Sequence, residues 1–247
     1  MSVYSFRYLW VVMITKLVIN RAISQDNRAI NLGALSERLR AQNRCEEAIK
    51  ARQTALKAAR KAVDWYRIMY KCFPEAVAAT VAANLARSLN ILGTNFSALN
   101  RHAEALKATQ EGVDLLRSLY EKKPEAFATD MAVSLNILGN MFCALNRHAE
   151  ALKATQEGAD LLRSLYDKKP EAFADNLAMS LMQLVGMFQQ IGRREDAFKV
   201  TLESVNLLPN LCKKQPEAFA DNLAMRPNDL GITFIESNTD EEDIEEA

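Results

Sequence analysis

Glycine, proline and aromatic residues are scarce in this chain. Its 247 residues include 8 glycines and 6 prolines, and aromatic residues make up 7%. Together with a hydrophobic content of 49%, this composition excludes collagen-like chains and disordered low-complexity chains. Alanine, leucine, lysine and glutamate are abundant, and with so few helix breakers they favour an all-α fold.

Groups that bind metals or perform catalysis are few as well. The two histidines, His102 and His148, have no carboxylate or thiolate neighbour at the spacing of a metal site. The four cysteines form no CxxC pair, a pattern typical of free thiols in a reducing cytosol. GxSxG, HExxH and P-loop motifs are absent. We therefore expect no enzyme activity, no metal and no cofactor.

Neither sign of charge is in excess, because 31 basic residues balance 31 acidic ones. The charges are unevenly placed: residues 236–247 carry seven acids and no base, which leaves residues 1–235 with a surplus of seven bases. That surplus is too small and too scattered to indicate nucleic-acid binding. The apolar run from Tyr8 to Ile19 contains Lys16 and is shorter than the ~20 residues that span a membrane.

A long internal repeat organises the middle of the chain. Residues 88–128 and 134–174 align without a gap at an offset of 46 residues. A period of this size is typical of stacked helical repeats, in which no single unit buries its apolar face alone. Only five aligned pairs differ: Thr94/Asn140, Asn95/Met141, Ser97/Cys143, Val113/Ala159 and Glu121/Asp167.

Each copy is expected to form two antiparallel helices. In the later copy, the apolar spacing predicts a first helix over 130–145 and a second over 148–167. Between them lies Asn146, which is matched by Asn100 in the earlier copy and by Gly192 in the next. A position that holds only Asn or Gly predicts a left-handed residue at the end of a helix. Pro170 is expected to end the second helix.

The flanking repeats depart from this pattern. The first repeat begins at Asn27, and a duplication of seven residues lengthens its second helix by about two turns. In the fourth repeat, Pro209 predicts a kink in the second helix. After it, Pro227 shortens what we interpret as a terminal half-repeat.

The helix pairs resemble the tetratricopeptide repeat (TPR). The family's pattern is matched by Leu92-Gly93, Phe96, Ala105 and Gly112 and by their counterparts 46 residues later. The units are longer than the usual ~34 residues, which is similar to the kinesin-light-chain type and to the repeat tails of fungal nucleotide-dependent sensor proteins. The resemblance covers about residues 27–236. It implies a right-handed superhelical solenoid of antiparallel helix pairs, with about four repeats and a terminal half-repeat.

The predicted domain organisation has three parts. Residues 1–24 form an irregular leader or capping helix, and a targeting segment or a misplaced start is the open alternative. Residues 25–236 form the α-solenoid. Residues 237–247 form an acidic tail without apolar periodicity, which we expect to be disordered.

The resemblance also implies a binding groove, because the first helices of such repeats line a concave wall. In the kinesin-light-chain-like motif LNNLA, asparagines bind a peptide backbone, and LNILG keeps the first of them here as Asn90 and Asn136. Alternatively, these asparagines are ordinary polar residues on a solvent-exposed helix surface. Differences between the twin copies at 94, 95 and 97 favour a partner. The candidate binding residues are Arg87, Asn90, Thr94, Ser97, Asn136, Asn140, Cys143, Met182 and Gln189.

The sequence therefore predicts a cytoplasmic adaptor that binds a peptide or protein segment in its groove. The alternative is a regulatory or self-associating module, autoinhibited by its acidic tail or belonging to a larger nucleotide-dependent sensor protein. On the first interpretation, alanine at both Asn90 and Asn136 weakens binding and changes stability by less than about 1 kcal/mol.

Overall fold

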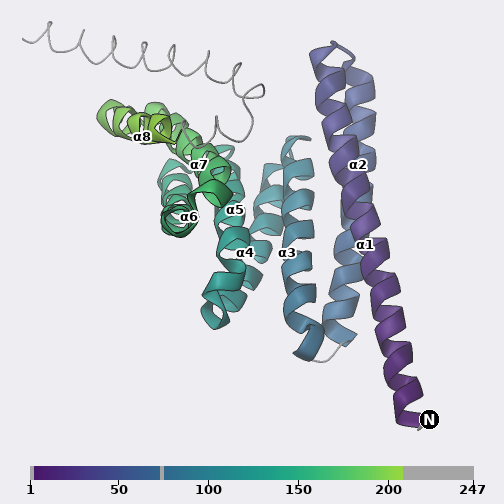
Figure 1. The fold of residues 1–247 in the computed structure, drawn as a ribbon. Helices are drawn as coiled ribbons and strands as arrows, with labels where there is room; N and C mark the ends of the chain where they lie inside the picture. The colour runs from purple at the N-terminus through teal and green to yellow at the C-terminus, as the bar shows by residue number, and fades with distance from the viewer. Residues whose placement is uncertain (1–2, 73–74, 208–247) are drawn as a thin grey trace, which may run out of the picture. The chain divides into compact units, whose positions relative to one another are not determined.

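The computed structural model describes residues 3–72 and 75–207, and within these the side chains of 16–71 and 78–207. This part of the chain is all-α and consists of eight helices, of which α1 with α2, α3 with α4, and α7 with α8 pack as antiparallel pairs (Figure 1). The first helix of each repeat, which is α1, α3, α5 or α7, is called its first helix below. The helices are α1 (Val3–Ala41), α2 (Cys45–Cys72), α3 (Glu75–Ser97), α4 (His102–Lys122), α5 (Pro124–Cys143), α6 (His148–Lys168), α7 (Pro170–Gln190) and α8 (Arg194–Asn206).

The first helix pair is longer than the others. The leader expected over 1–24 has no boundary at its end, because residues 3–41 form the single helix α1. The sequence explains this continuity, since neither Gly nor Pro occurs between residues 3 and 32. Val18, Ile19 and Ala22 of this segment pack into the hydrophobic core. The predicted lengthening of the second helix is confirmed, because α2 has 28 residues and α4 has 21.

The turns within the pairs have the predicted left-handed residues. The φ angles of Asn100, Asn146 and Gly192 are 59°, 56° and 73°, and Asn43 has the same conformation at 58°. Asparagine tolerates this region better than other residues with a side chain, and glycine has no Cβ to clash. In the second pair, the amide of Arg101 then donates to the carbonyl of Phe96 over 2.9 Å, which closes the end of α3.

The connections between pairs are shorter than predicted. The first helix expected over 130–145 begins at Pro124 and ends at Cys143, and only Lys123 separates it from α4. Pro124 and Pro170 therefore begin helices α5 and α7. Proline suits the first position of a helix because its missing N–H would have no partner there and its φ is already helical.

The chain divides into two compact units. Unit 1 is Met1–Leu145 and unit 2 is Asn146–Ala247. The core of unit 1 is rich in alanine, with Ala59, Ala86 and Ala105 fully buried, so its helices approach one another closely. In unit 2, Leu162 and Leu181 are fully buried between neighbouring helices. Pro209, the half-repeat and the tail over 237–247 lie outside the described residues, and the superhelix stays a prediction.

Candidate binding surface on the first helices

The first helices of unit 1 are joined side by side through polar side chains. Between α3 and α5, the amide nitrogen of Asn90 donates to Ser134 Oγ over 2.6 Å. Arg87 pairs with both carboxylate oxygens of Asp130 at 3.1 and 2.8 Å. Between α1 and α3, Ser88 Oγ donates to Asp26 Oδ2 over 2.6 Å. We call the surface that these helices present the first-helix face, defined by Arg87, Thr94, Ser97, Asn140 and Cys143.

Asn90 and Asn136 do not belong to this exposed surface. Both were predicted to line a groove, but their exposed fractions are only 6% and 8%. A Cβ added at Gly112 of α4 would lie 3.1 Å from the carbonyl oxygen of Ala86 and 3.4 Å from Asn90 Oδ1, so α4 packs closely against α3 beside this amide. The sequence signal for the burial of these asparagines was that each occurs together with a glycine in the same repeat. Asn90 occurs with Gly112, and Asn136 occurs with Gly158 in the next repeat.

Replacing Asn90 should therefore change stability. Asn90→Ala leaves the buried hydroxyl of Ser134 without its donor, and we expect the free energy of unfolding to fall by about 1 to 2 kcal/mol. Urea unfolding of Asn90→Ala, Ser134→Ala and the double variant would measure the coupling of the two side chains, which we expect to be about 1 kcal/mol. Strictly additive losses would contradict the assigned hydrogen bond.

The remaining predicted residues of α3 and α5 lie at or near the surface. Thr94 and Asn140 are exposed, whereas Ser97 and Cys143 are half-buried. The hydroxyl of Thr94 donates to the carbonyl of Asn90 over 2.6 Å, so part of its polarity is used within α3. Burial raises the pKa of the Cys143 thiol, which favours its protonated form. The face therefore offers neutral hydrogen-bonding groups.

Arg87 contributes less free charge than the sequence suggested. Its guanidinium is exposed, but the bidentate pair with Asp130 engages it, and the hydrogen bonds that it donates to this carboxylate raise the pKa of Arg87. An arginine fork that already holds a carboxylate has few donors left for another anion. Arg87 therefore joins α3 to α5 as well as lining the face.

One difference between the twin copies has a structural cause. Asn95 is buried, and its side-chain oxygen accepts a hydrogen bond of 3.4 Å from the buried guanidinium of Arg52, which also pairs with Glu37. Its counterpart Met141 instead belongs to the hydrophobic core of unit 1. The change at this position follows the lengthened helix α2, which supplies Arg52. Only the changes at Thr94 and Ser97 remain as differences on the first-helix face.

The predicted residues of the fourth repeat lie on α7 in unit 2. Met182 is 53% exposed, and Gln189 is also exposed. Met179, one turn before Met182, is exposed to a similar degree, so this helix presents a more apolar surface than α3 does. Methionine side chains adapt readily to irregular partners, and a contact region on α7 stays a prediction.

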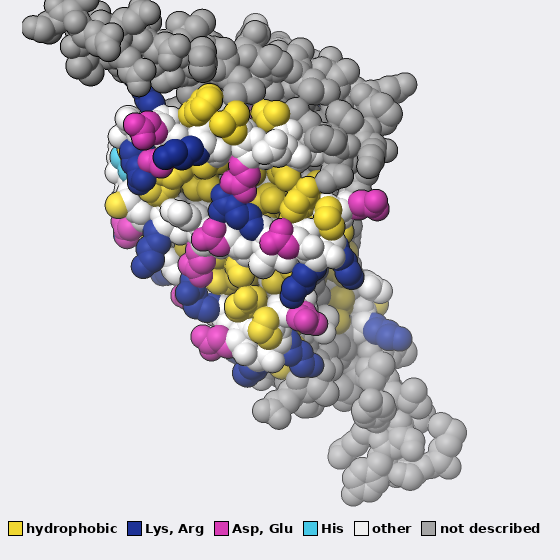
Figure 2. All heavy atoms as spheres, turned by 60° about the vertical axis from the view of Figure 1, so that its left-hand side comes forward, with side chains coloured by type: hydrophobic (Ala, Val, Ile, Leu, Met, Phe, Trp, Pro, Cys, Tyr) yellow, Lys and Arg dark blue, Asp and Glu magenta, His cyan; other side chains and the backbone are white. Residues whose placement is uncertain are grey.

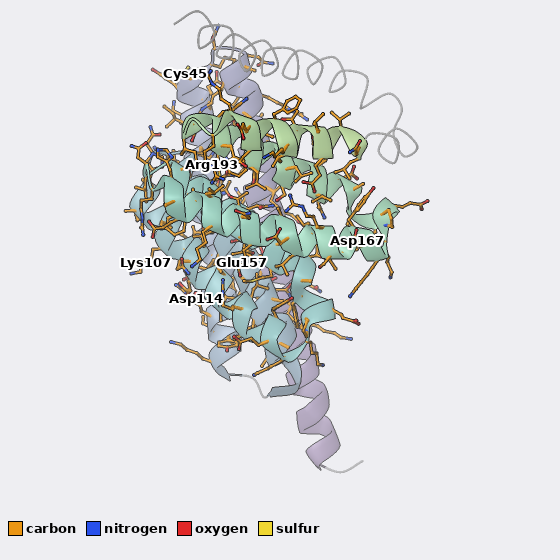
Figure 3. All side chains as sticks on the ribbon, turned by 90° about the vertical axis from the view of Figure 1, so that its left-hand side faces the viewer. Cys45, Lys107, Asp114, Glu157, Asp167 and Arg193 are labelled. Atoms are coloured by element: carbon orange, nitrogen blue, oxygen red, sulfur yellow. The ribbon has the colours of Figure 1, made fainter. Side chains whose placement is uncertain are left out.

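Charged side chains elsewhere on the surface are mixed in sign. Lys107 and Asp114 are labelled on α4 in Figure 3, and both are exposed. On the face drawn in Figure 2, basic and acidic side chains are interspersed among apolar ones. Ion pairs join second helices within each unit, as with Arg67 and Glu111, whose closest approach is 2.6 Å. Such a surface lacks the basic stripe expected of a nucleic-acid site.

Titratable groups form no metal cluster in the described part of the chain, where no three His, Cys, Asp or Glu side chains come together. Burial raises the pKa of Asp26 to about 6, but this carboxylate lies between α1 and α3 and bonds to Ser88. Burial also raises the pKa of Tyr66 to about 12. No helix among the described residues has the length and apolarity needed to cross a membrane.

Comparisons with known proteins define the fold and give no closer relationship. No protein-family model matches the sequence, and no curated protein matches it.

Among solved structures, the match to the apo form of RapI covers 90% of this chain and 73% of the RapI chain, with 14% identity and a TM-score of 0.52. BtubC from P. vanneervenii matches 78% and 92% of the two chains with 13% identity and a TM-score of 0.46. YrrB, described as a TPR protein with an unusual peptide-binding site, matches 80% and 97% with 18% identity and a TM-score of 0.36. The likeness to RapI has a TM-score above one half, and it shows the fold alone. The chain thus has the TPR-like helical-repeat fold that its sequence predicts.

Proposed function

We propose that this protein is a cytoplasmic scaffold or adaptor that binds a segment of a protein partner on its first-helix face. TPR-like helical repeats are generally protein–protein interaction modules. The observation that carries the proposal is the joining of α3 to α5 by Asn90–Ser134 and Arg87–Asp130, which leaves Thr94 and Asn140 exposed beside these contacts. No catalytic role is part of this proposal.

The buried asparagine supports binding indirectly. A hydrogen bond of 2.6 Å between Asn90 and Ser134 fixes α3 against α5, so the exposed groups are held in place before a partner arrives. A surface that is already ordered loses less conformational entropy when it binds. Hydroxyl and amide groups such as those of Ser97 and Asn140 can both donate to and accept from a peptide main chain. Affinity would then arise from several modest contacts along the helices.

Site-specific photo-cross-linking tests the location of the partner. We expect a photoreactive phenylalanine analogue at Asn140 of the full-length protein to form a covalent adduct with the bound protein. The same analogue at Asp114, an exposed residue of α4, serves as the control and should give little adduct (Figure 3). Mass spectrometry of the Asn140 adduct identifies the partner segment. Equal adduct yields from both positions, or adducts from Asp114 alone, would contradict the proposed surface.

A further inference from the structure

A basic cavity in unit 1 lies apart from the groups assigned to the first-helix face. It lies between the end of α1, the first half of α2 and the turn that joins α3 to α4, and its volume is about 580 Å³. Cavities of this size are typical of small-molecule sites. None of the lining residues is acidic, and four of them are cationic: Arg40, Lys57, Arg60 and Arg101.

Two of these cations are held in place by an aromatic ring. The guanidinium groups of Arg60 and Arg101 stand over the Phe96 ring at 5.2 and 4.7 Å from its centre, distances at which a cation and a ring attract each other. Both also approach the carboxylate of Glu104, Arg60 at 3.9 Å and Arg101 with two nitrogens. One carboxylate balances one of the two positive charges, so this ordered pair of arginines keeps a net positive charge.

The other two cations have no acidic partner among the described residues. Arg40 donates to the carbonyl of Ala98 over 3.1 Å, which holds the end of α1 beside the turn after α3. Lys57 is exposed on α2, and no ion pair joins it to another side chain in the described part of the chain. Like charges that share a cavity repel one another. An anion that carries more than one charge would relieve this repulsion.

Packing of the repeats explains only part of this arrangement. The stacking of Arg101 belongs to the repeat itself, because an arginine stands over a phenylalanine at 4.9 Å in the fourth repeat as well. Alignment of the first repeat with the second matches Arg40 to Ser97 and Arg60 to Gln110. The second repeat thus packs with neutral residues at both positions, so the two additional arginines point to a ligand.

We propose that this cavity binds a small organic phosphate, with the phosphate group on the guanidinium groups and the organic part on the apolar lining. A phosphate monoester carries about −1.5 to −2 charges at neutral pH and has three strong acceptor oxygens. Arginine forks bind such oxygens in pairs, and two arginines together match the charge of the dianion. Ile49, Leu56 and Leu99 supply the apolar lining. A single carboxylate would leave more of the positive charge unbalanced.

This site is separate from the surface proposed for a protein partner. The residues that line the cavity differ from those that define the first-helix face. Binding of a phosphate can therefore be measured without the partner, and the two proposals stand or fall separately.

Three small anions test the chemistry of the site on the full-length protein: phenyl phosphate, phenyl sulfate and inorganic phosphate. Ligand-observed NMR at neutral pH would measure the two phenyl esters directly and inorganic phosphate by its displacement of phenyl phosphate. We expect phenyl phosphate to bind with a dissociation constant of roughly 0.1 mM. Phenyl sulfate has the same shape but less negative charge, and inorganic phosphate lacks the ring, so each should bind at least about fivefold more weakly.

A variant that gives the cavity the residues of the second repeat locates the bound phosphate. Arg40→Ser combined with Arg60→Gln should weaken the binding of phenyl phosphate about tenfold. The control, Lys122→Gln with Lys123→Gln, removes the same charge from an exposed turn and should change binding by less than about twofold.

A second pair of variants keeps the test decisive if the double arginine variant fails to fold, which circular dichroism would show. Lys57→Gln removes one exposed cation of the cavity and should weaken binding about threefold. Lys107→Gln, at the corresponding exposed position of the second repeat, is its control and should bind as the wild type does (Figure 3).

Three results would overturn the proposal. The first is no detectable binding of phenyl phosphate at millimolar concentration, and the second is an equal loss in the cavity and control variants. The third concerns a phosphorylated protein segment, which carries the same group. A tyrosine-phosphorylated peptide should bind no more tightly than phenyl phosphate, and binding at least about tenfold tighter would assign the cavity to a protein ligand instead.

Discussion

Gly93→Ala is expected to lower the free energy of unfolding by about 2 to 3 kcal/mol. A Cβ at this position would lie 2.3 Å from Thr109 Oγ1 and 3.2 Å from the carbonyl oxygen of Ala105. Thr109 is fully buried, and its hydroxyl donates to the same carbonyl over 3.0 Å. The threonine must therefore give up its bond or α4 must move away from α3. The close crossing of one helix pair thus depends on the absent side chain of Gly93.

Urea unfolding followed by circular dichroism measures this effect, and Gly186→Ala is its matched control. A Cβ at Gly186 of α7 would meet no atom within 4 Å. Alanine is the better helix former, so the control should gain about 0.5 to 1 kcal/mol. The fourth repeat has Val185 at the position that corresponds to Gly93. If Gly93→Ala unfolds at the same urea concentration as the wild type, α3 and α4 can separate enough to hold a side chain at this position, as the fourth repeat does with Val185. The close crossing of α3 and α4 is then not required for stability.

Much of the fold could be predicted from the sequence because corresponding positions in its repeats can be compared with one another. The offset of 46 residues placed corresponding helices and turns, and the exchange of Asn146 for Gly192 revealed a backbone requirement that the φ angles confirm. Boundaries were predicted less well. Pro124 was matched to the end of a unit, but proline restricts the residue before it and is favourable at the first position of the next helix.

The exposure of Asn90 could not be predicted from periodicity. Helical spacing shows which side chains share a face, but it does not show which neighbouring helix covers that face. Asn90 lies away from the leucine stripe and is nevertheless covered, because Ser134 of α5 accepts its hydrogen bond and α4 packs against it at Gly112. Asparagine is usually exposed, so its burial here needed a specific partner that only the packed helices reveal.

The contact between Asn95 and Arg52 has a similar cause. The two residues are far apart in the sequence, and their hydrogen bond of 3.4 Å exists only because α2 packs against α3. Differences between near-identical copies therefore mix two effects: adaptation to an irregular neighbour, as at Asn95, and change on exposed surface, as at Thr94. Sequence comparison alone does not separate them.

A charge insertion on the first-helix face should abolish partner binding. Thr94→Arg combined with Asn140→Arg places two bulky cations on exposed positions of α3 and α5. Unpaired charge and lost hydrogen bonds at an interface each cost several kcal/mol, so we expect the affinity to fall by at least about a hundredfold. Stability should change by less than about 0.5 kcal/mol, because neither side chain is buried.

Calorimetric titration of the partner segment identified by cross-linking, into this double variant and into a charge-matched control, tests the proposed binding surface most directly. The control is Ser118→Arg with Ser164→Arg, which adds the same charge at exposed positions of α4 and α6. We predict that the control binds within about threefold of the wild type, whereas the double variant gives no measurable heat at concentrations that saturate the wild type. Wild-type affinity in the double variant, or an equal loss in the control, would contradict binding on the first-helix face.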